Sequence, residues 1–237
     1  MYILIDHRIP DEAKKNLSAY GQLIEFKSNS ITYNTIASHP DIYCCQTPDQ
    51  LIIAPNTPSD VIDSLFFKNI QYVVGNQFVG SEYPYTSHYN AVVTKDFLIH
   101  NIDNTERKIV EFCTGKKTIK VKQGYTRCNL IAIKNTSFIT SDKGIYKQMK
   151  TNMNISALYV NPDKIILTDQ KNGFFGGCCG IFRNKLFIIG SLNFLEHGVA
   201  VKEFTLSNGI EIIELYNGPL YDGGSIFFIE SKSNQLD

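Results

Sequence analysis

Two apolar stretches decide the fold: Tyr2-Ile3-Leu4-Ile5 near one end of the chain and Ile226-Phe227-Phe228-Ile229-Glu230 near the other. Each has the length and the β-branched or aromatic composition of a strand. The first stretch precedes a helix but lacks a hairpin partner, whereas the second has neither a partner nor a following helix. Pairing the two supplies both partners and removes exposed strand edges. The sequence therefore predicts that the N- and C-terminal strands lie side by side.

Between these stretches the chain repeats one order of elements, a helix followed by an apolar strand. The predicted helices span Asp11–Tyr20, Ser59–Phe67, Thr105–Cys113, Lys143–Lys150 and Val199–Leu206. The predicted strands after them span Gln22–Phe26, Ile70–Val74, Thr118–Val121, Ile155–Val160 and Ile210–Leu215. The expected helix ends are Ser59 and Thr105 as N-caps and Gly21, Gly115 and Gly209 as left-handed residues after the last turn.

A hairpin with a polar turn precedes four of the helices. The hairpins are Ile42–Cys45 with Leu51–Ala54, Ala91–Val93 with Phe97–Ile99, Leu130–Ile133 with Phe138–Thr140, and Cys179–Phe182 with Leu186–Ile189. The paired terminal strands complete the fifth hairpin. The prediction is an α/β fold: one domain over residues 1–237, a five-bladed α/β propeller of strand-strand-helix-strand repeats.

The amino-acid composition argues against two classes of binding partner, nucleic acids and membranes. Lysine plus arginine equals aspartate plus glutamate, 23 each, so no net basic surface is available for nucleic acid or anionic lipid. No apolar run approaches the roughly 20 residues of a membrane span, and the first residues do not resemble a signal peptide. We therefore expect a cytoplasmic protein without nucleic-acid or membrane partners.

Six cysteines occur, and four of them form two adjacent doublets, Cys44-Cys45 and Cys178-Cys179. No two have the Cys-x-x-Cys spacing of a zinc or redox site. No His-x-x-x-His pattern accompanies them. We expect no metal site and no cofactor, and most of the thiols are expected to be buried small hydrophobic groups in a reducing compartment.

The five-unit architecture and two short motifs resemble the guanidino-group-modifying enzymes, or penteins. Asp222-Gly223-Gly224-Ser225-Ile226 is similar to the acidic-Gly-Gly element of the deiminases, and Ser38-His39-Pro40-Asp41 is similar to their His-x-Asp element. The paired chain ends put the two motifs in neighbouring blades. The resemblance implies a cysteine nucleophile, a histidine acid/base and carboxylates that bind a cationic substrate.

The nucleophile is where this chain departs from the family pattern. The blade after the His-x-Asp element begins His88-Tyr89-Asn90, without a cysteine. In the alternative register, Phe228 occupies the cysteine position. Thiol chemistry would therefore require a cysteine from a different blade.

The residues that open the five hairpins are expected to converge on one polar axial pocket. The resemblance assigns His39 as acid/base and Asp41 and Asp222 as cation-binding carboxylates. The substitute nucleophiles are Cys178, which follows a Gly-Gly pair, and Cys128, whose thiolate Arg127 could favour. The further substrate-binding candidates are Ser225, Asn129, Asn90 and Arg127.

Each candidate also has a purely structural interpretation: a turn histidine, a loop-capping aspartate or a packed thiol. Two functions therefore stay open. One is an enzyme, a guanidino-group hydrolase or amidinotransferase that acts on a small guanidino, amidine or amide compound. The other is a non-catalytic protein that binds a small ligand or a protein partner, like the ribosome-binding member of the same superfamily.

Overall fold

The computed structural model describes residues 1–28 and 31–230. The fold is mixed α/β, with five three-stranded sheets of strand order β15-β1-β2, β3-β4-β5, β6-β7-β8, β9-β10-β11 and β12-β13-β14. The strands are β1 (Tyr2–Asp6), β2 (Gln22–Phe26), β3 (Cys44–Gln46), β4 (Leu51–Ile53), β5 (Val73–Val74), β6 (Val92–Val93), β7 (Phe97–His100), β8 (Lys117–Lys120), β9 (Leu130–Lys134), β10 (Ser137–Thr140), β11 (Ser156–Tyr159), β12 (Cys179–Phe182), β13 (Lys185–Ile188), β14 (Glu211–Glu214) and β15 (Phe227–Ile229).

The α-helices are α1 (Asp11–Leu17), α2 (Pro40–Tyr43), α3 (Ser59–Phe67), α4 (Arg107–Phe112), α5 (Thr126–Asn129), α6 (Lys143–Lys150) and α7 (Gly198–Ser207). The 3-10 turns are η1 (Ser18–Tyr20), η2 (Ile102–Asn104), η3 (Gly176–Cys178) and η4 (Leu192–Phe194). The five longest α-helices are α1, α3, α4, α6 and α7, and each overlaps one of the helices that the sequence predicts.

The predicted pairing of the terminal strands is confirmed. β1 pairs antiparallel with β15, with Tyr2 opposite Ile229, Ile3 opposite Phe228 and Leu4 opposite Phe227. The other edge of β1 pairs in parallel with β2. The sheet therefore contains residues from both ends of the chain.

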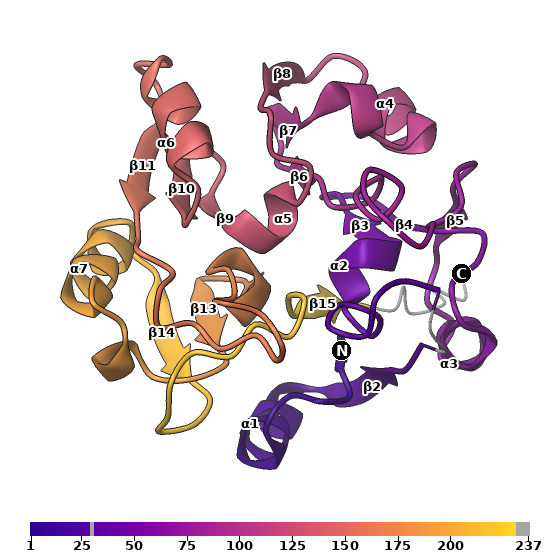
Figure 1. Ribbon diagram of the computed structural model, residues 1–237, viewed down its shortest axis with the longest axis horizontal. Coiled ribbons are helices and arrows are strands. Elements are labelled where there is room, and N and C mark those ends of the chain that lie inside the picture. Colours follow the sequence, from indigo (N-terminus) through magenta and orange to yellow (C-terminus); the bar gives the residue numbers. More distant parts are fainter. Residues whose placement is uncertain (29–30, 231–237) are drawn as a thin grey trace, which may run out of the picture.

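All five sheets share this arrangement. The middle strand pairs antiparallel with the first strand and in parallel with the strand that follows the helix. The sheets follow one another around a common centre, with α1, α3, α4, α6 and α7 on the outside (Figure 1). Within the described residues backbone pairing joins strands inside each sheet and not from sheet to sheet, so there is no closed barrel.

Contacts between inner strands connect neighbouring sheets. β12 contacts β15 and β9, and β6 contacts β3 and β9. The side chain of Gln46 in β3 completes the series, because its Nε2 donates to the carbonyl of Phe228 in β15 at 2.7 Å. The first strands of all five sheets therefore surround the centre.

Apolar side chains are buried between neighbouring sheets. One cluster joins Ile3 and Ile5 of β1 and Leu17 of α1 to Phe187 of β13 and Phe228 of β15. The rings of Phe187 and Phe228 lie with centroids 4.6 Å apart. This packing leaves the centre free for polar residues.

Several predicted element ends are wrong. Ile42 lies in the one-turn helix α2, not in a strand, and the N-cap residues of α3 and α4 are Pro58 and Glu106. Glu106 caps α4 because its carboxylate accepts from the N–H of Lys108, a role that the neighbouring Thr105 was expected to have.

The glycines after the helices differ among themselves. Gly115 and Gly209 have the expected positive φ of 89° and 66°. Gly21, at φ 168°, is extended instead. In the described part of the chain no helix has both the length and the apolar character needed to cross a bilayer.

We expect Ile3→Ala to lower the free energy of unfolding by about 3 kcal/mol, because it removes a fully buried side chain from the sheet that joins the chain ends. Urea unfolding measures the change. Met153→Ala is the control, because its side chain is fully exposed and should change stability by less than about 0.5 kcal/mol. Equal small effects of the two substitutions would mean that the terminal pairing is not part of the cooperative core.

Candidate active site

Three one-turn helices stand directly before inner strands. They are α2 before β3, α5 before β9 and η3 before β12, and α5 contacts η3. In α2 the turn follows from Pro40 at its first position, where a fixed φ suits a helix and no N–H is needed. Three of the five groups of residues predicted to open the hairpins therefore lie in or beside helical turns, whereas those before β6 and β15 lie in loops.

Asp41 of α2 is hydrogen-bonded to three other segments: α5, the segment before β6 and the loop before β15. Its Oδ2 accepts from the hydroxyl of Ser225 at 2.6 Å and from the thiol of Cys128 at 3.1 Å. Its backbone N–H donates to the carbonyl of Gly224, and its carbonyl accepts from Nδ2 of Asn90 at 2.9 Å. Its Oδ1 is buried and has no hydrogen-bond partner among the described residues.

Asn90 fixes the position of Cys128. Its Oδ1 accepts from the backbone N–H of Cys128 at 3.0 Å, and its Nδ2 lies 3.2 Å from the sulfur. Cys128 is therefore held from two sides, by Asn90 and by Asp41. These hydrogen bonds explain why the buried polar residues Asp41 and Asn90 are tolerated at the centre.

His39 directly precedes α2 and is almost fully buried. Its Nε2 lies 3.8 Å from Oδ2 of Asp6, and its Nδ1 has no partner among the described residues. Arg8 holds the carboxylate of Asp6, with Nη2 donating to Oδ2 at 2.6 Å and Nε to Oδ1 at 3.0 Å. Gly224 lies against His39 at φ 65°, and a Cβ at Gly224 would overlap the Cβ of His39.

Asp222 lies in the loop before β15. Its Oδ2 accepts from the N–H of Phe174 at 2.8 Å and its Oδ1 from the N–H of Gly224 at 3.1 Å. Burial raises the pKa of Asp222 to about 6, and the Asp41 carboxylate acts in the same direction, whereas His39 and the backbone donors lower it. The carboxyl therefore changes charge near neutral pH.

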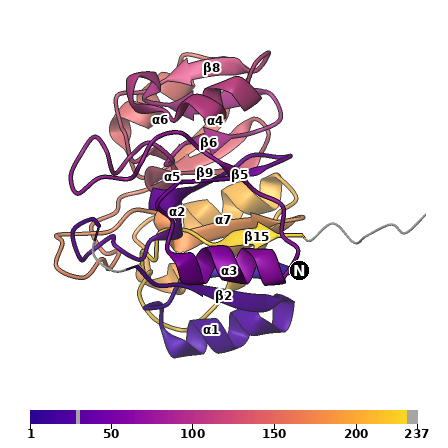
Figure 2. The same ribbon diagram turned by 90° about the vertical axis from the view of Figure 1, so that its right-hand side faces the viewer.

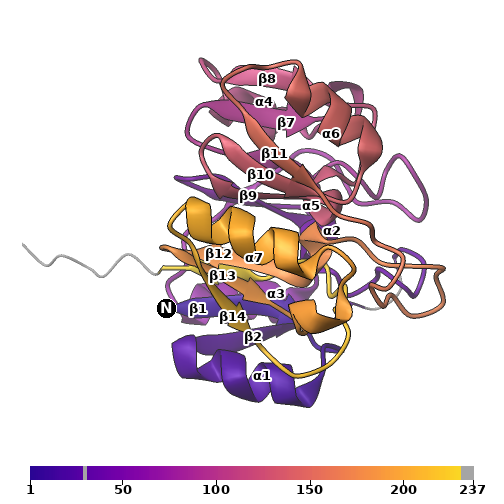
Figure 3. The same cartoon turned by 90° about the vertical axis from the view of Figure 1, so that its left-hand side faces the viewer.

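His39, Cys128 and Asp222 line one cavity of about 230 Å³. Apolar groups from Ile36, Ile42, Leu167 and Phe174 complete most of its wall. The loops that precede α2 and η3 extend on one face of the molecule, opposite the N-terminus (Figure 2, Figure 3). The cavity lies on this loop face.

Tyr33 and Tyr125 also line the cavity. Their hydroxyls are 2.9 Å apart, and the Tyr125 hydroxyl also lies 2.5 Å from Oγ1 of Thr86. The side chain of Tyr33 is 42% exposed, which places this pair where the cavity meets the surface.

Neither candidate nucleophile is a thiolate in the unliganded protein. Burial raises the pKa of Cys128 far above its ordinary value, and Asp41 and Asp222 act in the same direction. Burial and Asp222 likewise raise the pKa of Cys178, whose thiol donates to the carbonyl of Phe174 at 3.2 Å. Attack on a substrate would therefore require removal of the thiol proton at the time of reaction.

The structure places three predicted site residues elsewhere. Cys178 is fully buried and does not line the cavity of His39. Asn129 holds the local backbone, with Nδ2 donating to the carbonyl of Tyr125 and Oδ1 accepting from Ser141. Arg127 lines a different cavity. Its guanidinium interacts electrostatically with Cys128, but burial and the carboxylates of Asp41 and Asp222 outweigh this and raise the pKa of the thiol. A role of Arg127 in favouring a thiolate stays a prediction.

Sequence reasoning missed Asp6, Arg8, Tyr33 and Tyr125. Asp6 and Arg8 carry a usable signal, because an acidic residue ends the first strand and a basic residue follows two positions later. The tyrosines have no such signal. Tyr33 and Tyr125 are 92 positions apart and meet only in the folded chain.

The sequence model of a family of unknown function, DUF6873, matches residues 4–227. No curated protein is significantly similar in sequence. Three solved structures are similar in fold, each with a TM-score of 0.54. C. jejuni agmatine deiminase is 9% identical, with 94% of this chain and 93% of that chain covered.

The DDAH of Pseudomonas aeruginosa in complex with citrulline is 7% identical, with 90% and 91% covered. An amidinotransferase from Microseira wollei is 8% identical, with 100% and 96% covered. At these identities the similarity concerns the fold, which is the pentein fold.

The raised pKa of Asp222 predicts a pH-dependent stability. Its folded-state pKa of about 6 exceeds the ordinary 3.8, so the folded protein binds more protons than the unfolded chain between these values. The stability that Asp222 contributes therefore falls as the pH rises through this window and is constant above it. Asp222→Asn lacks this titration.

We expect the difference in unfolding free energy, wild type minus Asp222→Asn, to fall by on the order of 2 kcal/mol as the pH rises from about 4 to about 7. Urea titrations across this range measure it. The loss of backbone hydrogen bonds in the variant adds only a constant offset. A difference that does not change with pH would contradict the raised pKa.

Proposed function

Since the chain belongs to the DUF6873 family and has the pentein fold, we propose that its loop-face cavity binds a small guanidino or amidine cation and presents it to Cys128. One observation carries this proposal: His39, Cys128 and Asp222 line the same cavity, beside a buried carboxylate, Asp41, with a free oxygen. The proposal includes a fold-level part, in which residues 1–237 form one domain and the five sheets are the blades of an α/β propeller.

Charge and hydrogen bonding suit the cavity to a planar cation. Guanidinium and amidinium groups offer several coplanar N–H donors and match carboxylates in two-point contacts. Asp222 lines the cavity and supplies the acceptors, and the buried Asp41, which does not line it, adds negative charge behind the Cys128 thiol that it accepts from. A bound cation would also favour the ionised form of Asp222, whose pKa is otherwise raised.

The two tyrosines add a surface for the rest of the ligand. Tyr33 and Tyr125 stand where the cavity opens, and aromatic faces attract cations and planar groups. The cavity of about 230 Å³ is small enough to exclude a bulky side group beyond the cation. The ligand class is therefore a small compound with one terminal guanidino or amidino group.

The same residues define a reaction. The Cys128 sulfur attacks the cationic carbon as its proton passes to Oδ2 of Asp41, the acceptor at 3.1 Å. His39 donates a proton to the departing amine and then takes one from the water that releases the product. In an amidinotransferase a second amine would take the place of that water.

The second candidate is binding without turnover. It is favoured by the high pKa of the Cys128 thiol and by the absence of cysteine at both positions where the family pattern has it, His88–Asn90 and Phe228. Binding and chemistry therefore need separate measurements.

For binding, we expect agmatine or a simple alkylguanidine to raise the melting temperature at millimolar concentration, because ligand binds only the folded state. Asp222→Asn should weaken binding at least about tenfold, which corresponds to about 1.4 kcal/mol. Asp11→Asn, a fully exposed carboxylate, is the matched control and should bind like wild type. If none of these cations shifts the melting temperature, the cation site is wrong.

For chemistry, we expect 2-chloroacetamidine to alkylate Cys128 faster than neutral 2-chloroacetamide, after each rate is divided by its rate with free cysteine. The cation should concentrate at Asp222 and Asp41, so the corrected preference should be about tenfold or more. Peptide mass spectrometry locates the adduct, and Asp222→Asn should abolish the preference. Equal corrected rates would exclude the catalytic candidate and leave binding without turnover.

A further inference from the structure

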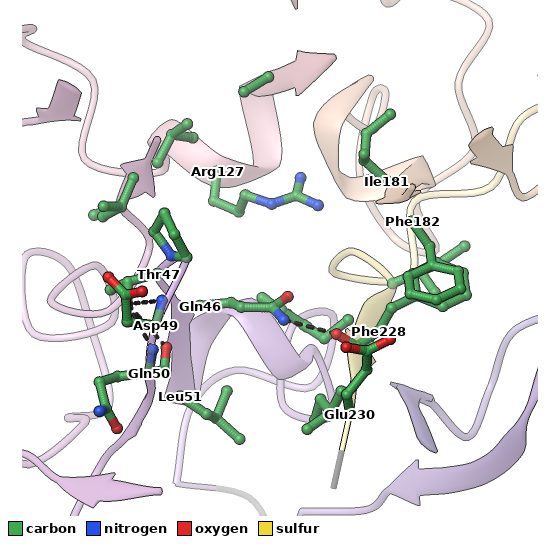
Figure 4. Close-up of a pocket in the computed structure, with 18 of the residues that line it drawn as sticks. Gln46, Thr47, Asp49, Gln50, Leu51, Arg127, Ile181, Phe182, Phe228 and Glu230 are labelled. Carbon is green, nitrogen blue, oxygen red and sulfur yellow. Dashed lines mark hydrogen bonds between the residues drawn. The ribbon is translucent and has the colours of Figure 1, made fainter. Parts of the chain in front are cut away.

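A second and larger hollow, of about 580 Å³, lies at the centre of the fold. It shares no lining residue with the cavity of His39. Its lining comes from inner strands and their turns, including Gln46, Ile181, Phe182 and Phe228 (Figure 4). The only predicted site residue among its lining residues is Arg127.

The wall of this hollow is formed by free strand edges and apolar side chains. β6, β9 and β12 each pair with a neighbour on one side only, and residues of all three line the hollow. The rings of Phe182 and Phe228 are stacked, with centroids 5.3 Å apart. A ligand here would meet aromatic faces and backbone groups rather than a cluster of charged side chains.

Four charged residues also line the hollow, and Arg127 is the one among them that is partly buried rather than exposed. Its guanidinium points into the hollow from α5 (Figure 4). Nη1 donates to the carbonyl of Gly176 at 2.8 Å and Nη2 to that of Cys179 at 2.9 Å. Of the five N–H groups of a guanidinium, the other three have no acceptor among the described residues.

The charge of Arg127 has no direct counter-ion. No carboxylate of the described residues lies within 4.0 Å of its nitrogens. Burial lowers the pKa of Arg127, and Asp41 is the main group that acts against this. Arg127 is partly buried, and a charge that is withdrawn from water is normally paired, because an unpaired one is costly.

We propose that this hollow is a binding site for a small organic carboxylate with an aromatic or branched apolar body. The carboxylate pairs with the free N–H groups of Arg127, and the apolar body lies against Phe182 and Phe228. A planar carboxylate matches the fork of a guanidinium, which favours it over a spherical anion. The hollow has room for a ligand of this class, such as hippurate.

The remaining charges of the hollow do not neutralise Arg127. Asp49 and Glu230 also line it, and both side chains are exposed to solvent. Arg183 lies over the ring of Phe182, with the guanidinium carbon 5.0 Å from the ring centroid. Asp49, Arg183 and Glu230 are exposed, so Arg127 is the charged lining residue that is partly buried, and it selects the ligand.

The site is independent of the proposed cation site. Asp222 is the carboxylate that lines the loop-face cavity, Asp41 lies beside that cavity, and neither lines this hollow. The two cavities therefore select opposite charges, and failure of one proposal does not decide the other.

Isothermal titration calorimetry with hippurate and with the uncharged hippuramide tests the proposal on the full chain. We expect saturable binding of hippurate and at least about tenfold weaker binding of hippuramide. Inorganic phosphate, which lacks an apolar body, should bind more weakly than hippurate. The proposal would be overturned if hippurate did not bind, or if hippuramide or inorganic phosphate bound as tightly as hippurate.

Two variants locate the site. Arg127→Met should abolish hippurate binding, with circular dichroism reporting whether the variant folds, because it also loses two hydrogen bonds. Gln46→Glu changes an exposed side chain and adds a negative charge to the hollow, so the folded variant should bind hippurate about tenfold more weakly. Because it loses the hydrogen bond to the Phe228 carbonyl, circular dichroism also checks its fold. Asp60→Asn, an exposed carboxylate on α3, is the control. Wild-type affinity in Gln46→Glu would place the ligand elsewhere.

Discussion

The antiparallel contact between β1 and β15 is the constraint on which the rest of the molecule depends. It brings together segments separated by more than two hundred positions and sets their register, with Ile3 opposite Phe228. Because β15 is then an inner strand, the loop before it reaches the centre and meets α2. Ser225 contacts Asp41 across 184 positions only through this arrangement.

The centre that results is polar and locally strained. Ser225 has a positive φ of 77°, which is unfavourable for a residue with a side chain, and Asp41 retains a buried oxygen without a partner. Both features cost stability, and the apolar clusters between the sheets offset that cost. Such local costs are typical of sites that hold a ligand or a reacting group.

The two cavities at this centre differ in the charge of the residues beside them. Asp41 and Asp222 give the loop-face side a negative character, and Arg127 gives the opposite hollow a positive one. Asp41 and Arg127 are not directly paired, although Asp41 raises the pKa of Arg127 and so favours the charged guanidinium. Burial has opposite effects on the two kinds of group, raising the pKa of a carboxyl and lowering that of a guanidinium.

The sequence neighbours Arg127 and Cys128 line different cavities. They are adjacent in α5, yet one lines the large hollow and the other the cavity of His39. A helical turn rotates successive side chains by about 100°, so adjacent residues point in different directions. Sequence proximity had suggested that Arg127 acts on the thiol, and the two groups do interact electrostatically although their side chains line different cavities.

The order of strands and helices, the terminal pairing and the convergence of His39, Asp41, Asn90, Cys128 and Ser225 were determined by the sequence alone. Hydrophobic periodicity and the repeat carry that information, because each three-stranded sheet must bury the same faces against its neighbours. Only the tertiary structure decided the side-chain directions and the charge states: the support of His39 by Asp6, the separation of Arg127 from Cys128 and the raised pKa of Asp222. These depend on distances and burial between residues far apart in the chain, which no local pattern encodes.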